Sequence, residues 1–202
     1  MRRTSWILGL ALVFPFIASG QNFPRVDIFG GYTYTKVSSY SVPLAVISQG
    51  GLGTFTLPAY GLNGWTGGAT VSANKWFGVT GEFTDLYGTP VKAYGSTPLS
   101  SREHEYSYLF GPRLSYRGKR WTPFVHALFG GAHGTVLVSA SGVNVPIIVT
   151  ENKFAMAIGG GLDFKIQKHV AVRLIQTEYG MTRFVGSHQN NMRISTGLLL
   201  SF

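Results

Sequence analysis

Residues 105–116 read EYSYLFGPRLSY, and the character of the side chain changes at every step. The even positions carry Tyr, Phe, Pro and Leu, whereas the odd positions carry Glu, Ser, Gly and Arg with a single Leu. Successive side chains of a β-strand point to opposite faces. This period of two therefore predicts a strand with one apolar face and one face of small or charged residues.

The same alternation recurs in three other clear segments, at residues 26–35, 154–165 and 192–202. In each of them the second face consists mostly of Gly, Ala, Ser and Thr with isolated charges. Small side chains suit the narrow lumen of a small barrel better than an open face in water. Alternating segments of about ten residues, separated by turns, are typical of a transmembrane β-barrel whose apolar face contacts lipid.

Eight strands are predicted, at residues 25–36, 63–74, 77–87, 103–116, 121–135, 152–165, 169–182 and 191–202. Their connections alternate between long ones (residues 37–62, 88–102, 136–151 and 183–190) and short ones (residues 74–76, 117–120 and 167–169). Short periplasmic turns and long outer loops characterise bacterial outer-membrane barrels. The predicted fold is all-β, an eight-stranded antiparallel up-and-down transmembrane β-barrel with both ends at the periplasmic side.

Aromatic residues gather near the ends of these segments, as in the girdles that flank the lipid-facing band of a barrel. The predicted girdle residues are Tyr32, Tyr34, Trp65, Trp76, Phe77, Tyr87, Tyr116, Trp121 and Phe124.

The composition excludes several other classes of protein. Of the 202 residues, 45% are hydrophobic and only 12% are charged, so the chain is neither intrinsically disordered nor a coiled coil. It has no cysteine, which excludes disulfides and thiol chemistry. The net charge of +9 comes from singly spread basic residues without a nucleic-acid motif, and we expect no nucleic-acid partner.

The N-terminus has the layout of an export signal. A basic Met1-Arg2-Arg3 precedes the apolar stretch of residues 6–17, and a small-residue cleavage site ends at Gly20. The apolar stretch is short for a membrane span, and a proline interrupts it. We predict a signal peptide at residues 1–20 and a barrel domain at residues 21–202.

Several short pieces resemble a known family. They are FGGY (29–32), GVTGEF (78–83), LFGPRL (109–114), GGGLD (159–163) and the terminal GLLLSF (197–202). In these pieces and in its layout, the chain is similar to the small eight-stranded bacterial outer-membrane β-barrel family that includes the transmembrane domain of outer-membrane protein A. The resemblance implies a location in the outer membrane of a Gram-negative cell and assembly by the barrel machinery with periplasmic chaperones. It also implies that Phe202 is part of the assembly signal, and we expect no peptidoglycan-binding domain after the last strand.

Seven charged residues fall on the faces assigned to the lumen: Asp27, Glu82, Glu105, Arg113, Asp163, Lys165 and Arg193. A buried charge must be paired, so we expect Arg113 and Arg193 each to pair with one of Glu82, Glu105 and Asp163. Two interpretations are open. The residues can form an ion-pair network that closes the lumen, or they can line a narrow gated aqueous path.

Arg173 and Glu178 are five residues apart, so one of them faces lipid unless a bulge intervenes. We predict that Glu178 points inward with Gln176. Arg173 is then predicted to point outward near the periplasmic interface, where its long stem can reach water.

The sequence offers little catalytic chemistry. None of the five histidines has a partner at metal-ligand spacing, so no metal site, cofactor or catalytic residue is predicted. His126 shares the inward face of its strand, and His104 is expected in a surface charge cluster. Outer-membrane lipid deacylases use a His and a Ser on barrel strands, and Ser107 and Ser115 are available without a matching local pattern.

Two predicted outer loops contain apolar stretches, at residues 41–47 and 143–149. They can be hairpins that continue the strands above the membrane, or a surface that contacts lipopolysaccharide, another cell or a host molecule. The favoured function is a non-enzymatic outer-membrane protein with a structural or surface-interaction role. It would be a monomer in contact with membrane lipid and lipopolysaccharide. The first alternative is a narrow, porin-like small-solute channel. The second and less favoured alternative is a lipid-modifying enzyme.

Overall fold

The computed structural model describes residues 25–46, 51–57, 59–89, 91–94, 97–140, 143–184 and 187–202. The predicted leader, with its cleavage after Gly20, lies outside the described residues. Within these residues no helix is long and apolar enough to cross a bilayer. The strands are β1 (Val26–Val37), β2 (Tyr40–Val46), β3 (Gly51–Leu57), β4 (Tyr60–Ser72), β5 (Phe77–Gly88), β6 (Val91–Tyr94), β7 (Thr97–Ser115), β8 (Trp121–Ala140), β9 (Val143–Lys165), β10 (Val170–Phe184) and β11 (Ser187–Ser201).

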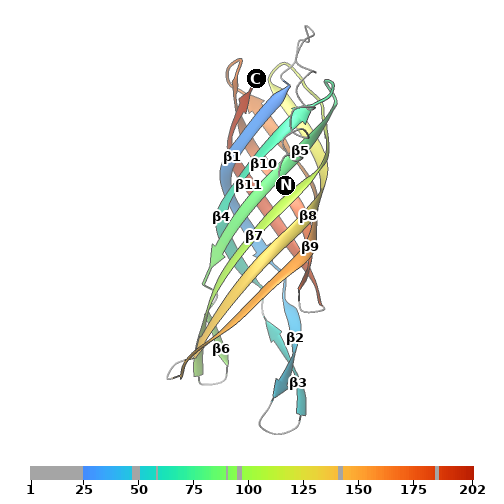
Figure 1. Ribbon diagram of the computed structural model, residues 1–202. Coiled ribbons are helices and arrows are strands. Elements are labelled where there is room, and N and C mark those ends of the chain that lie inside the picture. Colours follow the sequence, from blue (N-terminus) through green and yellow to red (C-terminus); the bar gives the residue numbers. More distant parts are fainter. Residues whose placement is uncertain are drawn as a thin grey trace, which may run out of the picture.

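Eight of these strands close into a barrel, which confirms the predicted fold class (Figure 1). Around the wall the order is β1, β4, β5, β7, β8, β9, β10 and β11, and β11 pairs with β1 to complete the ring. All neighbouring pairs in the ring are antiparallel. Because the wall closes on itself, the backbone N–H and C=O groups of its strands hydrogen-bond to neighbouring strands. A strand in hydrocarbon requires this, since no water is available there.

The three short turns and both ends of the barrel wall lie at one end of the molecule, here called the turn end (Figure 1). The backbone N–H of Arg25 donates to the carbonyl of Phe202 over 2.7 Å, and the N–H of Phe202 donates to Val26 over 2.8 Å. The last residue therefore continues the pairing of β11 with β1. This arrangement agrees with the prediction that both ends of the barrel share one side.

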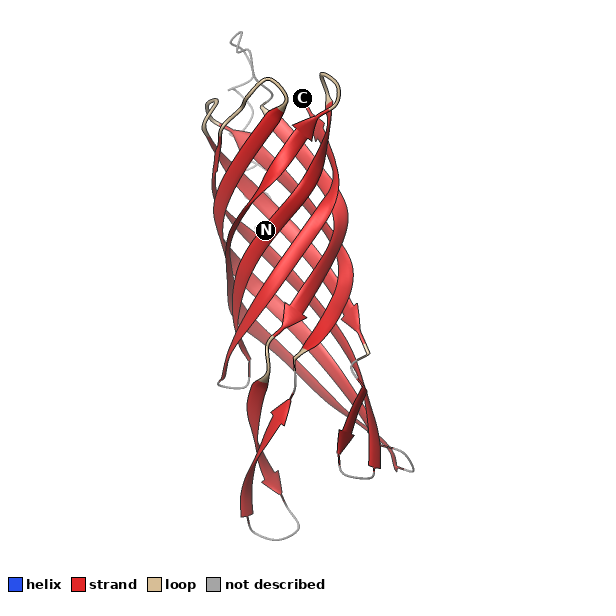
Figure 2. Ribbon diagram, turned by 180° about the vertical axis from the view of Figure 1, so that it is seen from behind, coloured by secondary structure: helices blue, strands red, loops and turns tan. Residues whose placement is uncertain are grey.

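At the opposite end, here called the loop end, strands continue well beyond the ring (Figure 2). β9 has 23 residues, whereas a transmembrane strand needs about 9–11. β8 and β9 stay paired out to Ala140 and Val143, β6 pairs with the first residues of β7, and β2 and β3 form a separate hairpin. The hairpin interpretation of residues 135–151 is confirmed. The predicted long connections 37–62 and 88–102 also consist largely of strand.

The alternation in the sequence corresponds to the two faces of the wall. Phe110 and Leu198 are 64% and 60% exposed on the outer face, where lipid would cover them. On the inner face the hydroxyl of Thr33 lies 2.6 Å from that of Thr66 and 2.8 Å from that of Ser195. Small polar residues therefore satisfy one another across neighbouring strands inside the barrel.

Aromatic pairs lie near the turn end of the wall, as predicted for a girdle. The rings of Trp76 and Tyr116 are 5.2 Å apart, and those of Trp121 and Phe164 are 4.7 Å apart. Phe124 is an exception, and its assignment to the girdle is wrong. Its ring is buried in the lumen because its position has the inward parity of β8.

A β-bulge in β10 overturns a second prediction. The register with β9 shifts between Arg173 and Ile175, so that Leu174 and Ile175 are both exposed on the outer face. Arg173 and Gln176 consequently both point inward, and the predicted outward orientation of Arg173 is wrong. The bulge places the guanidinium in the lumen, whereas an arginine facing lipid at mid-depth costs about 2–4 kcal/mol. Glu178 points inward, as predicted.

Candidate functional site in the barrel lumen

The lumen contains most of the buried ionisable side chains of the described wall. Six of the seven charges that the sequence assigns to the lumen are buried there: Asp27, Glu82, Glu105, Arg113, Asp163 and Arg193. Lys165 is exposed at the turn end, where it lines a small cavity. Four further polar residues are buried among them: His126, Arg173, Gln176 and Glu178.

Near the turn end, the Asp163 carboxylate forms ion pairs with two arginines. Nη2 of Arg113 donates to Oδ2 of Asp163 over 2.9 Å, and Nε of Arg173 donates to Oδ1 over 2.7 Å. The Phe124 ring lies 3.7 Å from Cζ of Arg113 and 4.5 Å from Cζ of Arg173. An aromatic face attracts a desolvated guanidinium, so the ring supplements a carboxylate that two cations share.

Glycines on β9 make room for this packing. A Cβ on Gly161 would lie 2.7 Å from the Phe124 ring, and one on Gly159 would lie 2.8 Å from Cγ of Glu178. The Gly159–Gly161 run is therefore a packing feature of the strand, as its sequence context indicates.

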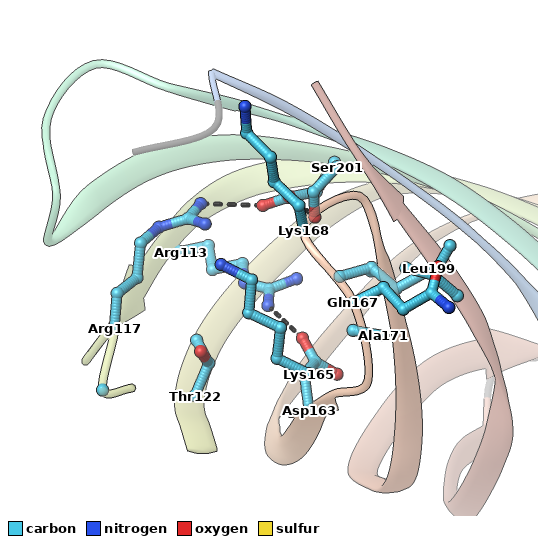
Figure 3. A pocket seen from close by; sticks show the side chains of 13 residues that line it. Arg113, Arg117, Thr122, Asp163, Lys165, Gln167, Lys168, Ala171, Leu199 and Ser201 are labelled. Atoms are coloured by element: carbon cyan, nitrogen blue, oxygen red, sulfur yellow. Dashed lines mark hydrogen bonds and ion pairs between the residues drawn. The ribbon is translucent and has the colours of Figure 1, made fainter. Parts of the chain in front are cut away.

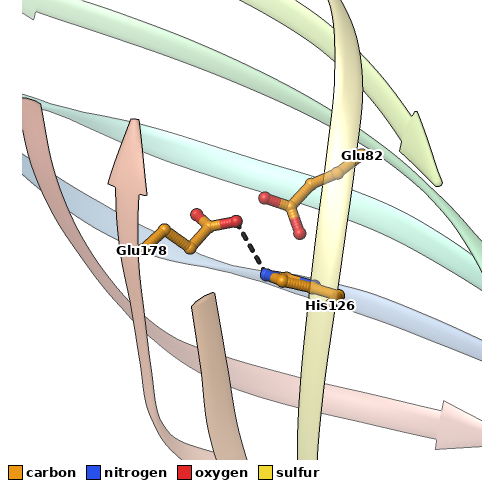
Figure 4. Close-up of side chains that lie close together, drawn as sticks. All are labelled: Glu82, His126 and Glu178. Carbon is orange, nitrogen blue, oxygen red and sulfur yellow. Dashed lines mark ion pairs between the residues drawn. The ribbon is translucent and has the colours of Figure 1, made fainter. Parts of the chain in front are cut away.

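Farther along the lumen, Glu82 on β5, His126 on β8 and Glu178 on β10 point toward one another (Figure 4). Nε2 of His126 lies 2.9 Å from Oε1 of Glu178. Nε2 of Gln176 donates to Glu82 over 3.0 Å, and Nη1 of Arg193 is 3.5 Å from one carboxylate oxygen of each glutamate. Two acids and one imidazole thus share a buried site with a single guanidinium.

The two groups are connected through Gln176. Its side-chain carbonyl accepts a hydrogen bond of 2.5 Å from Nη1 of Arg173, while its amide nitrogen donates to Glu82. Arg193 also donates to Thr84 over 2.8 Å and interacts electrostatically with Glu105. Arg113 is therefore paired with Asp163, and Arg193 lies at ion-pair distance from both Glu82 and Glu178, so each of these inward arginines faces an acid.

A cavity of about 140 Å³ opens at the turn end (Figure 3). Asp27 accepts hydrogen bonds from Arg117 over 2.7 Å and from Ser201 over 2.6 Å at its edge. Lys165 and Lys168 also line it. This mouth is rich in cations, and the Arg113–Asp163 pair forms part of its lining.

Buried apolar side chains fill part of the lumen toward the loop end. Val37, Leu62 and Leu86 form one buried cluster, and Leu109 and Leu128 belong to another with three alanines. An eight-stranded barrel is just wide enough for its own side chains to fill. The charged groups are therefore enclosed between apolar layers and the paired arginines.

The arrangement of two carboxylates, one imidazole and a guanidinium can hold a cation or a proton. Ser107 and Ser115 are buried on the inner face, and Ser115 accepts a hydrogen bond from Arg113. Nε2 of His104 lies 2.6 Å from Oδ1 of Asp85, and the His104 ring stacks on the ring of Tyr87. These residues lie on the outer face of the wall, whereas both serines lie on the inner face. The convergence of His126 with Glu82 and Glu178 is not visible in sequence spacing, although all three share the inward parity of their strands.

Solved structures of low sequence identity share this fold. Ail, the attachment invasion locus protein of Yersinia pestis, is 17% identical, with a TM-score of 0.53 over 88% of this chain and 99% of its own. OprG from Pseudomonas aeruginosa is 11% identical, with a TM-score of 0.59 over 91% and 98%. The outer membrane protease OmpT from Escherichia coli is 9% identical, with a TM-score of 0.52 over 91% and 99%.

No curated protein sequence matches the chain. The family model of the outer membrane protein beta-barrel domain matches residues 7–202, which is nearly the whole chain. Together with the closed eight-stranded wall and its apolar outer face, this match shows that the chain belongs to the outer membrane protein beta-barrel domain family.

Proposed function

We propose that this outer-membrane barrel is non-enzymatic and that its loop end forms a rigid contact surface outside the cell. The observation behind this proposal is the length of the strands that cross the loop end. At about 3.4 Å per residue, the 23 residues of β9 span roughly 75 Å along the strand, more than twice the roughly 35 Å of a transmembrane strand. Hydrogen-bonded strands, unlike flexible loops, can engage a partner without a large ordering cost.

The enclosed lumen supports this proposal over the channel alternative. The Arg113–Asp163–Arg173 group and the apolar clusters occupy the space through which a solute would pass. A conducting path would require breaking buried ion pairs, which typically costs several kcal/mol.

The enzyme alternative has less support. The fold also occurs in a protease, so the family leaves catalysis open. In this chain the candidate serines face the lumen, where a lipid or peptide substrate has no access. The name of Ail refers to attachment, which suggests a surface role for a barrel of similar size, although the likeness is one of fold.

Shortening the loop end tests the proposal directly. Residues 38–59 and residues 138–147 are each replaced by Asn-Gly, which joins the paired residues Val37 and Tyr60, and Leu137 and Ile148, by a two-residue turn. Cells with the shortened barrel are expected to adhere less to lipopolysaccharide-coated, bacterial and epithelial surfaces at equal amounts of folded protein. Unchanged adhesion to all three surfaces would contradict the contact role.

Two further measurements address the alternatives. The wild-type barrel in a planar lipid bilayer is expected to give no steady conductance, and a steady conductance would favour the channel. Mass spectrometry of lipid A from cells with and without the protein is expected to show identical species, and a modified species would favour the enzyme.

A further inference from the structure

We propose that Glu82, His126 and Glu178 bind one divalent transition-metal ion inside the barrel. The three residues come from β5, β8 and β10, and one potential ligand atom from each lies within 4.8 Å of the others. All three side chains are at least nine-tenths buried. The proposal is independent of what the loop end contacts.

The polar atoms of His126 and Glu178 lack hydrogen bonds in a way that points to a ligand, whereas the Glu82 carboxylate accepts hydrogen bonds from Gln176. Both ring nitrogens of His126 and both carboxylate oxygens of Glu178 lack hydrogen-bond partners among the described residues. The 2.9 Å contact between Nε2 and Oε1 lacks the geometry of a hydrogen bond, although it counts as an ion pair by distance. Buried polar atoms without partners are rare and costly, and a bound ion would satisfy one ring nitrogen of His126 and the Glu178 carboxylate together.

The donor set favours a borderline metal such as zinc. One imidazole nitrogen and two carboxylate oxygens suit Zn²⁺ and related divalent ions, with water as a fourth ligand. Ligand atoms about 2.1 Å from a tetrahedral zinc lie about 3.4 Å apart. Side-chain adjustments of about 1 Å would bring the three ligand atoms to that spacing.

The charge of the site also favours a divalent cation. Two buried glutamates face one another here, and Arg193 lies 3.5 Å from each of them. That distance is at the limit of a hydrogen bond, and Nη1 of Arg193 donates to Thr84 instead. The guanidinium therefore reduces the repulsion between the two carboxylates without a close hydrogen bond to either.

Access limits when the metal can bind. The site lies deep in the lumen, beyond the Arg113–Asp163–Arg173 group as seen from the turn end, with buried apolar clusters beside it. We therefore expect the ion to enter while the barrel folds, when the three strands come together, and to exchange slowly afterwards.

Zinc content after refolding tests the site. The full chain is unfolded in urea, refolded in detergent with Zn²⁺, washed with a chelator and assayed for metal by mass spectrometry. The wild type is expected to retain about one zinc per chain, and His126→Gln and Glu178→Gln are expected to retain background amounts. His104→Gln and His169→Gln, which change exposed histidines on other parts of the wall, should retain zinc like the wild type.

Two outcomes would overturn the proposal. One is a wild type that holds no more zinc than Glu178→Gln, and the other is a folded His126→Gln variant that holds as much as the wild type. Should the lumen variants fail to fold, Co²⁺ replaces Zn²⁺ in the wild type and the imidazole resonances are followed by NMR. Paramagnetic shifts at His126 support the site, whereas shifts confined to the exposed histidines refute it.

Discussion

Replacing Asp163 with asparagine should destabilise the barrel by about 3–5 kcal/mol, the usual cost of removing one partner from a buried ion pair. Asp163 is the carboxylate that contacts both Arg113 and Arg173, and all three side chains are almost fully buried. Its loss leaves two desolvated guanidiniums near the same Phe124 ring.

The shared carboxylate makes a specific order of stabilities testable. Asp163→Asn should be the least stable variant, because it leaves two buried cations without their carboxylate partner. Adding Arg113→Met should recover part of the loss, and adding Arg173→Met as well should recover most of it, because no unpaired buried charge then remains. If Asp163 paired with Arg113 alone, the double variant would instead recover the full loss of stability.

Urea unfolding in detergent, followed by tryptophan fluorescence, measures these differences. Asp85→Asn is the control for an ion pair that water reaches, because Asp85, whose side chain is 14% exposed, pairs on the outer face with His104, whose side chain is 44% exposed. Its expected cost is about 0–1 kcal/mol. The reasoning would be refuted if Asp163→Asn differed from the wild type by no more than this control, or if the triple variant were as unstable as Asp163→Asn.

Gly161→Ala should destabilise the barrel by about 1–3 kcal/mol in urea, because the added methyl would crowd the Phe124 ring. Gly81→Ala is its control, since a Cβ there meets nothing within 4 Å, and equal stability of the two variants would contradict the packing. Deleting Phe202 should lower the amount of folded barrel in the outer membrane, measured as the heat-modifiable band on a gel, and an unchanged band would show that the terminal aromatic is dispensable. Protease added to intact cells should cut the loop end, and cleavage confined to the short turns would reverse the predicted orientation.

Much of this fold can be read from the sequence because strand parity is a local property. The alternation around Phe110 and Arg113 assigns one side chain to lipid and the other to the lumen without any knowledge of neighbouring strands. The same rule correctly places Asp27, Glu82 and Arg193 inside. The alternation of short turns with long connections further predicts an even, antiparallel ring.

Only the tertiary structure determines which inward residues meet. Arg173 has outward parity by counting, and a bulge that depends on pairing with β9 turns it into the lumen. Asp163 contacts two arginines, and His126 meets glutamates from two other strands, because the register and closure of the barrel bring those strands to the same depth. Parity repeats every two residues along one chain, whereas register and bulges depend on contacts between residues far apart in sequence, so spacing alone does not encode them.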